Sequence, residues 1–235
     1  MSKKLEVINL NKTFNQGENA VHALTNVSFS VNSGEFVVIT GYSGSGKSTL
    51  LNALGCLLTT DSGSILVDGK DICAMNEKQR NSYRCKDISI IFQSYNLLSD
   101  LTVYENVLLG RKLGDNRSCN VDEVLSVLNL EKRKDHYPSE LSGGEQQRAS
   151  IARALCKGGS IYLCDEPTGA LDVENGIRVL QYLQDLAHNS NKTVIVITHN
   201  GLVSQAGDHN IVMRDGKIVE DSYNSSPLAV SKVNW

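Results

Sequence analysis

The stretch GYSGSGKST, residues 41–49, decides how the rest of the chain is interpreted. It lies between the apolar run FVVIT, residues 36–40, and a second apolar run that opens at Leu50. A β-branched run, a glycine-rich turn and a helix-forming run are the setting in which the pattern G-x-x-x-x-G-K-[ST] binds phosphate. A flexible surface loop that contains a lysine is the alternative interpretation. The flanking runs favour the phosphate-binding loop.

The residue types in this loop suit an anion. Glycines allow backbone conformations in which successive N–H groups turn toward a phosphate. The N-terminus of the following helix adds partial positive charge. We expect Lys47 to reach the β- and γ-phosphates of a nucleotide and the Ser48 hydroxyl to ligate Mg²⁺. The nucleotide contacts expected from this loop are Gly41, Tyr42, Ser43, Gly44, Ser45, Gly46, Lys47, Ser48 and Thr49.

The composition is that of a soluble globular protein. The 235 residues are 40% hydrophobic and 21% charged, with a net charge of −3, which argues against a general nucleic-acid partner. The start lacks the apolar core of a signal peptide, and no stretch approaches the roughly 20 apolar residues that span a bilayer. We therefore expect a cytosolic chain that contacts the membrane only through a partner. The six scattered cysteines are expected to be reduced thiols: Cys56, Cys73, Cys85, Cys119, Cys156 and Cys164.

The order of apolar patterns predicts an α/β core with an insertion. Continuous apolar runs predict buried parallel strands, whereas alternation around Asp-Gly predicts antiparallel ones. Helical spacing occupies most of residues 97–155. The expected buried strands are 36–40, 88–92, 161–164 and 193–198, the expected edge or antiparallel strands are 5–10, 27–31, 63–72 and 208–221, and a core helix is expected at 177–186. Residues 76–86 are interpreted as a polar connection.

The two ends of the pattern are less regular. Residues 12–19 are expected to form a polar loop that contains Phe14, whose ring either stacks on a nucleobase or fills a small apolar gap. The final segment, residues 222–235, is polar and weakly patterned. We expect a frayed tail there, with Trp235 as a partner anchor in the alternative interpretation.

Charged residues follow two of the predicted buried strands. Ligands of an open parallel sheet lie outside the carboxyl ends of its strands. Asp165 is expected to hold Mg²⁺ there, and Glu166 to polarise an attacking water. Carboxylates at a helix N-terminus are the alternative, which Pro167 disfavours. His199 follows the next strand and is expected to hydrogen-bond the γ-phosphate, the alternative being a structural histidine.

The segment LSGGEQQR, residues 141–148, is the second strong signal. Ser142 and Glu145 have the spacing of a capping box that opens a helix. Gly143 and Gly144 lower helix propensity by roughly 1 kcal/mol each, so close backbone approach must be required there. An anion is the natural candidate. Since the phosphate loop already cradles the nucleotide of its own chain, we expect this helix end to meet the γ-phosphate bound by another subunit.

Together these motifs resemble one family. GYSGSGKST, Gln93, LSGGEQQR, IYLCDEP, Ala170-Leu-Asp and His199, in this order, are similar to the ATP-binding subunit of ATP-binding cassette (ABC) transporters over nearly the whole chain. The resemblance implies a P-loop NTPase core with a mostly parallel sheet, an antiparallel β subdomain and an inserted helical subdomain. It places residues 1–94 and 157–221 in the core and β subdomain, about 95–156 in the helical subdomain and 222–235 in a tail, all within one domain.

The resemblance also assigns roles. It implies a head-to-tail homodimer that encloses two ATP–Mg²⁺ and hydrolyses both, with Lys47, Glu166 and His199 acting on the triphosphate. Phe14 would stack on adenine and Val21 would pack near the ribose. Gln93 would join Asp165 and Ser48 at the metal and link it to a transmembrane permease. The second subunit would contribute Ser142, Gly144 and Glu145, and Asp172 would communicate between the sites.

Finer features resemble a subgroup. GSGKSTLLNALGCL, IIFQSYNLLSDLTVYENV and CDEPTGALD are similar to macrolide exporters, lipoprotein-releasing ATPases, a cell-division ATPase and peptide-resistance transporters. Tyr42 stands where proline is commoner. The expected function is to power export of, resistance to or mechanotransmission of peptide, drug or lipoprotein-type substrates through a separate permease at the cytoplasmic face of a bacterial membrane. Within the subgroup, CDEPTGALD resembles peptide-export and peptide-resistance systems most. The alternative is an ATP-gated regulator of a cell-wall hydrolase, without transport.

Overall fold

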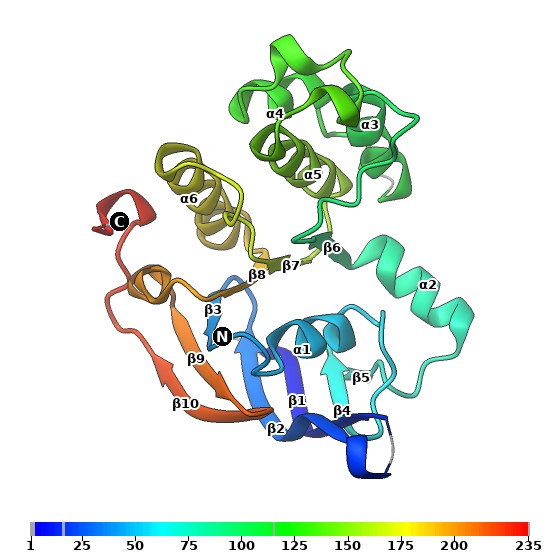
Figure 1. The fold of residues 1–235 in the computed structure, drawn as a ribbon, viewed down its shortest axis with the longest axis vertical. Coiled ribbons are helices and arrows are strands. Elements are labelled where there is room, and N and C mark those ends of the chain that lie inside the picture. The colour runs from blue at the N-terminus through cyan, green and yellow to red at the C-terminus, as the bar shows by residue number, and fades with distance from the viewer. Residues whose placement is uncertain (1–2, 16, 115, 235) are drawn as a thin grey trace.

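The computed structural model describes residues 3–15, 17–114 and 116–234. Two sheets and six α-helices organise these ranges (Figure 1). Trp235 and its expected partner contact lie outside the described residues.

The larger sheet has six strands in the order β10-β9-β3-β8-β7-β6. Strands β9, β3, β8, β7 and β6 are parallel, and β10 joins β9 through an antiparallel hairpin. The bounds are β3 Phe36–Thr40, β6 Ile88–Ile91, β7 Ile161–Asp165, β8 Thr193–Thr198, β9 His209–Arg214 and β10 Lys217–Tyr223. Continuous apolar runs had predicted β3, β7 and β8, and all three are almost fully buried.

The smaller sheet is antiparallel, in the order β2-β1-β4-β5. Its strands are β1 Lys3–Phe14, β2 Val21–Asn32, β4 Ser62–Val67 and β5 Lys70–Asp71. Strand β1 is longer than the sequence predicted and continues to Phe14, so the polar loop predicted from residue 12 onward is wrong for its first three residues. Several register shifts, with left-handed backbone at Asn9 and Asn26, had hidden the alternation.

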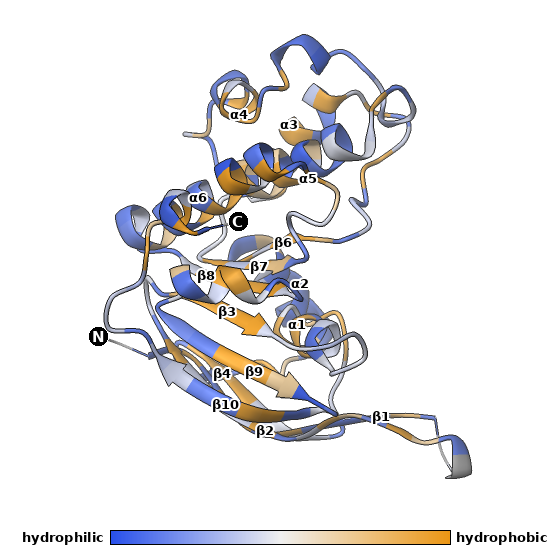
Figure 2. Ribbon diagram, turned by 60° about the vertical axis from the view of Figure 1, so that its left-hand side comes forward, coloured by the Kyte–Doolittle hydropathy of each residue, from blue (hydrophilic) through white to orange (hydrophobic). Residues whose placement is uncertain are grey.

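Helices pack on both faces of the larger sheet. Helix α1, Lys47–Leu54, lies in an apolar core shared with the smaller sheet. On the opposite face α5, Gly143–Lys157, and α6, Val173–Ser190, share a second core with α3, Val103–Leu113, and α4, Val121–Val127. In Figure 2 the apolar colour follows the inner strands and the inward faces of these helices. The P-loop NTPase fold class predicted from the sequence is confirmed.

Two further predictions are corrected by the structure. Residues 77–86 form helix α2, Glu77–Lys86, where the sequence suggested only a polar connection. The tail predicted at residues 222–235 is not frayed, because Val230 and Val233 are buried in the apolar core that contains α6. The buried Gln184 side chain on α6 donates to the carbonyls of Ala206 and Leu228 and accepts from the Val230 N–H at 3.1 Å, which fastens the tail to the helix.

Candidate nucleotide-binding site

The loop between β3 and α1 has the backbone that a phosphate cradle requires. Gly44 and Gly46 have φ of 79° and 99°, which are left-handed values that favour glycine. A Cβ on Gly46 would lie 2.3 Å from the Ala23 carbonyl oxygen, whereas one on Gly44 would meet nothing within 4 Å. Glycine is therefore needed at position 44 for conformation alone, and at position 46 for both conformation and space.

Lys47 is held over this loop by the loop itself. Its Nζ donates to the Gly41 carbonyl at 2.7 Å and to the Tyr42 carbonyl at 2.9 Å. Burial lowers the pKa of the ammonium, and the charges of Glu166 and Asp165 oppose that shift. The ammonium therefore occupies the concave side of the loop, where a phosphate would be bound.

Ser48, at the start of α1, and Asp165, at the end of β7, place two oxygen groups side by side that could ligate a metal ion. A hydrogen bond from Ser48 lowers the pKa of the Asp165 carboxyl, but burial is the larger effect and raises it. A half-buried carboxylate beside a hydroxyl is suited to a hard divalent cation, which favours oxygen ligands. Gln93, after β6, lines the same cleft. Within the described residues no three His, Cys, Asp or Glu side chains lie together as a metal site. The oxygen atoms of Ser48, Asp165 and Gln93 are of the kind that Mg²⁺ accepts alongside phosphate oxygens.

The Glu166 carboxylate is positioned by the end of β8. Glu166 has a left-handed φ of 47°, so the chain turns there and its side chain does not point away from Asp165 as an extended strand would require. Its Oε1 accepts from the His199 backbone N–H and from Nδ1 of the His199 ring, both at 2.9 Å. Its Oε2 accepts from the Thr198 hydroxyl at 3.2 Å. The structure thus pairs the two predicted catalytic groups Glu166 and His199 directly.

One open cleft of about 740 Å³ collects most of the predicted site. Its lining includes Phe14, Val21, Ser43, Gly44, Ser45, Gly46, Lys47, Ser48, Thr49, Gln93, Asp165, Glu166 and His199. Gly41 and Tyr42 are not in the lining; they act through carbonyls that hold Lys47, and the Tyr42 side chain is 79% exposed.

Three residues that line this cleft were not predicted from the sequence: His22, Ala23 and Asp215. Asp215 belongs to the hairpin turn between β9 and β10, whose next residue, Gly216, donates its N–H to the Ser45 carbonyl at 3.1 Å. This contact joins residues far apart in the chain, so no local pattern predicts it. His22 and Ala23 directly follow Val21 on β2 and could have been included as its neighbours.

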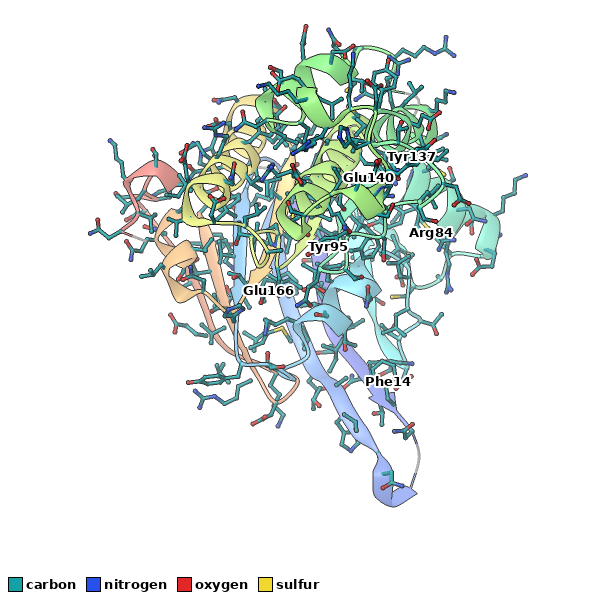
Figure 3. All side chains as sticks on the ribbon, turned by 45° about the horizontal axis from the view of Figure 1, so that its top comes forward. Phe14, Arg84, Tyr95, Tyr137, Glu140 and Glu166 are labelled. Atoms are coloured by element: carbon teal, nitrogen blue, oxygen red, sulfur yellow. The ribbon has the colours of Figure 1, made fainter. Side chains whose placement is uncertain are left out.

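The far end of the cleft presents an aromatic platform. Phe14 is 39% exposed and pairs across the strands with Val21. The Lys12 ammonium lies 5.5 Å from the centre of the Phe14 ring. In Figure 3 Phe14 lies at the tip of the smaller sheet, well separated from Glu166 near the strand ends. Phe14 therefore lines the cleft with an exposed ring, on which a base could stack.

The N-terminus of α5 lies outside this cleft. Ser142 and Glu145 form the predicted capping box, with the Ser142 N–H 2.8 Å from the Glu145 carboxylate and the Glu145 N–H 3.3 Å from the Ser142 hydroxyl. Hydrogen bonds from Arg133 and from the Ser142 backbone lower the pKa of Glu145 to about 2. The residues that the resemblance assigned to a second subunit, Ser142, Gly144 and Glu145, do not line the cleft of their own chain.

The two glycines of α5 have close neighbours within the chain. A Cβ on Gly143 would lie 3.1 Å from the Tyr95 hydroxyl, and one on Gly144 would lie 3.2 Å from the Ala170 carbonyl. Close approach was predicted for these glycines with an anion as the neighbour, whereas the structure also places protein oxygen atoms beside them. Asp172, two residues beyond Ala170, caps α6 by accepting from the Asn175 N–H at 2.9 Å.

The geometry of the cleft defines the class of protein to which the chain belongs. A glycine-rich loop between the buried strand β3 and helix α1, with Lys47 and Ser48 facing Asp165 and Glu166 at the end of β7, is the site of a P-loop nucleoside triphosphatase. The family model described as "ABC transporter" matches residues 24–169. The chain belongs to the ABC transporter family and is an ATP-binding cassette with ATPase chemistry.

Relatives and solved structures agree with this assignment. The chain is 46% identical to the macrolide export ATP-binding/permease protein MacB of Mannheimia succiniciproducens over 93% of this chain and 34% of that protein. It is 44% identical to the MacB protein of Neisseria meningitidis over 97% of this chain and 36% of that protein. The chain thus spans about a third of the length of these curated relatives.

Among solved structures, the dimeric structure of MJ0796, a bacterial ABC transporter cassette, matches with a TM-score of 0.88 at 36% identity, over 93% of this chain and 98% of that one. A post-hydrolysis state of the same cassette, bound to ADP and Pi, matches with a TM-score of 0.87. No helix in the described ranges has the length and apolar character of a membrane span.

Proposed function

We propose that this chain is the ATP-hydrolysing unit of a MacB-like exporter and powers a permease that moves drug, peptide or lipoprotein-type substrates. The observation that carries the proposal is the single cleft that brings Lys47, Asp165, Glu166 and His199 together. The macrolide-export name of its relatives supports export over the regulator of a cell-wall hydrolase. We assign residues 1–235 to one nucleotide-binding domain, with a helical subdomain at about 95–156.

Each group in the cleft has a role in this proposal. Lys47 and the loop N–H groups bind the β- and γ-phosphates, and Phe14 and Val21 hold the base and the ribose. Ser48, Asp165 and Gln93 would hold Mg²⁺, which would neutralise charge on the phosphate oxygens. Glu166 orients the attacking water and takes its proton, and His199 positions Glu166 through the 2.9 Å hydrogen bond and contacts the γ-phosphate.

The proposed active form is a head-to-tail homodimer that hydrolyses ATP at both sites. The position of Ser142, Gly144 and Glu145 outside their own cleft supports their use by the second copy. The dimer described for MJ0796, which is 36% identical, supports the same assembly. ATP favours the closed dimer only through contacts that the open state lacks, and the α5 N-terminus supplies such contacts.

A groove beside Gln93 supports contact with a permease at the cytoplasmic face of a bacterial membrane. This groove of about 300 Å³ is lined by apolar side chains that include Phe92 and Leu98, and by three cationic residues, Arg84, Arg153 and Lys157. An amphipathic helix with acidic residues has the complementary character. Membrane contact would then come only through this partner, and the number of membrane helices in a co-purified partner would separate a peptide-resistance permease from a division regulator.

The Glu166→Gln variant tests the proposed function. It should bind ATP, accumulate as a closed dimer in sedimentation experiments with Mg²⁺, and lose turnover because the amide cannot accept the proton of the water. Glu174→Gln, on the exposed start of α6, is the matched control and should keep wild-type turnover. Normal hydrolysis by Glu166→Gln would remove the role assigned to the carboxylate. A Glu166→Gln chain that stays monomeric with ATP and Mg²⁺, even with its membrane partner, would contradict the dimer.

A further inference from the structure

Two segments, or crossings, connect the sheet core with the helical layer formed by α3, α4 and α5. One segment is hydrogen-bonded to the core, and the other is hydrogen-bonded to the helices. At the second crossing, after α5, the Gly159 N–H donates to the buried Ser89 hydroxyl at 3.0 Å and the Ile161 N–H donates to the Asp87 carbonyl at 2.9 Å. These contacts attach the crossing to the core. Gly158, just before it, has a left-handed φ of 77°.

At the first crossing, after β6, the attachment is to the helices. The guanidinium of Arg153 on α5 donates to the carbonyl of Asn96 at 2.6 Å and to that of Tyr95 at 3.1 Å. Tyr95 and Asn96 both have left-handed backbone, with φ of 61° and 51°. Successive carbonyls point to opposite sides in an extended chain, whereas a helical conformation of either hand turns them the same way. This conformation lets one arginine receive both.

A second side chain completes this attachment. Asn106 on α3 is fully buried; its Oδ1 accepts from the Leu98 N–H at 2.9 Å and its Nδ2 donates to the Leu98 carbonyl at 3.1 Å. The Tyr95 hydroxyl also lies beside Gly143 at the other end of α5. Residues 95–98 are therefore bound to the helical layer, while Gln93, two residues earlier, lines the nucleotide cleft of the core.

We propose that Arg153 is a positioning residue that couples Gln93 to α5. Two charge-assisted hydrogen bonds attach residues 95–96 to α5. A displacement of α5 therefore also displaces Gln93, because only Ser94 separates Gln93 from Tyr95. Arg153 also lines the groove assigned to the permease. This inference rests on the proposed function, because it assumes that a permease binds the groove and that α5 contacts a second subunit's nucleotide. Arg153 would then link both contacts to Gln93 in the nucleotide cleft.

Hydrogen exchange of the isolated full-length chain, at a concentration at which sedimentation shows it to be monomeric, tests the coupling without dimer contacts at α5. In the wild type, adding ATP and Mg²⁺ should slow exchange in peptides covering residues 93–98 and also in those covering the start of α5. In Arg153→Met the first response should remain and the second should be lost. Arg111→Met is the matched control, because Arg111 also bonds a backbone carbonyl, that of Cys119, in the same layer. An α5 response to ATP that survives in Arg153→Met would overturn the proposal.

Kinetics separate positioning from a purely structural role. ATP affinity of the monomer should stay within about twofold of wild type, while kcat and ATP-driven dimerisation in the Glu166→Gln background should fall by about tenfold or more. Arg153→Lys, which keeps the charge and a donor, should be intermediate; it carries the test if the methionine variant does not fold. Equal kcat in a folded Arg153→Lys, or ATP affinity falling in step with kcat, would contradict the coupling. Failure of Glu166→Gln with Arg153 intact to dimerise would instead refute the proposed dimer, and the exchange experiment would still decide the role of Arg153.

Discussion

Two glycines in the phosphate loop provide a matched pair of substitutions. Gly44→Ala and Gly46→Ala place the same methyl group on residues that both have left-handed backbone. The conformational cost should be similar at both, about 1–2 kcal/mol. Only at Gly46 does the new Cβ lie 2.3 Å from a backbone oxygen, that of Ala23, which belongs to strand β2 and cannot move aside as a flexible side chain can.

The expected magnitudes follow from this difference. For Gly44→Ala the free energy of unfolding should fall by about 1–2 kcal/mol. For Gly46→Ala, strain and overpacking together should cost roughly 3–4 kcal/mol. Relief of that contact must move the loop away from β2 and turn its N–H groups from the phosphates. Loss of two or more hydrogen bonds to a charged ligand corresponds to an ATP affinity lowered by about 100-fold or more.

Urea unfolding and equilibrium titration with a fluorescent ATP analogue measure both quantities. Gly44→Ala should bind ATP with an affinity within about tenfold of wild type, since its Cβ meets nothing within 4 Å. The reasoning is refuted if the two variants bind ATP equally well, or if Gly46→Ala is no less stable than Gly44→Ala. Either result would mean that the contact with Ala23 does not constrain the loop.

Three other perturbations have defined outcomes. Gln184→Leu removes the donor to the Ala206 and Leu228 carbonyls and the acceptor of the buried Val230 N–H, so the free energy of unfolding should fall by about 2–4 kcal/mol, and limited proteolysis should cut the tail near Val230 while α6 stays intact; an uncut tail would contradict the fastening. The pKa of Glu145 is lowered from 4.5 to about 2, so the contribution of its carboxylate to stability is complete above pH 4.5 and is lost as pH falls toward 2. Arg133→Met should flatten this part of the curve of unfolding free energy against pH, and an unchanged curve would exclude Arg133 as the cause of the lowered pKa. Phe14→Ala should weaken ATP binding by about 1–3 kcal/mol while Phe14→Tyr keeps it, and equal affinities in a titration would remove the stacking role.

The strands and the phosphate loop could be predicted because their signals are local. Residues 36–40 and 193–198 are apolar without alternation because helices or a second sheet cover both of their faces. Asp165 and Glu166 follow such a strand directly, so their position at the ligand-binding edge of the sheet could be inferred from order alone.

The errors arose where local patterns were weak. Helix α2 buries only Tyr83, so it shows no apolar periodicity; its one signal was the capping box formed by Asn76 and Gln79. The tail is held by Gln184, some 40 residues earlier, through backbone groups that carry no sequence information. Asp215 lies in the cleft because of a similar long-range contact, that of Gly216 with Ser45. The sequence predicted the hairpin turn that contains Asp215 but not its place in the cleft.

The carbonyls of Gly41 and Tyr42 that receive the Lys47 ammonium have a kinetic consequence. These two hydrogen bonds hold the loop in its curved conformation, so little backbone rearrangement is needed when a triphosphate binds. The same tether must be exchanged for phosphate oxygens each time a nucleotide enters and restored each time one leaves. In each turnover the Lys47 ammonium would exchange the two carbonyls for phosphate oxygens and then return to them. Variants that reorient the Gly41 and Tyr42 carbonyls should therefore alter the rate of nucleotide exchange more than the rate of ATP hydrolysis.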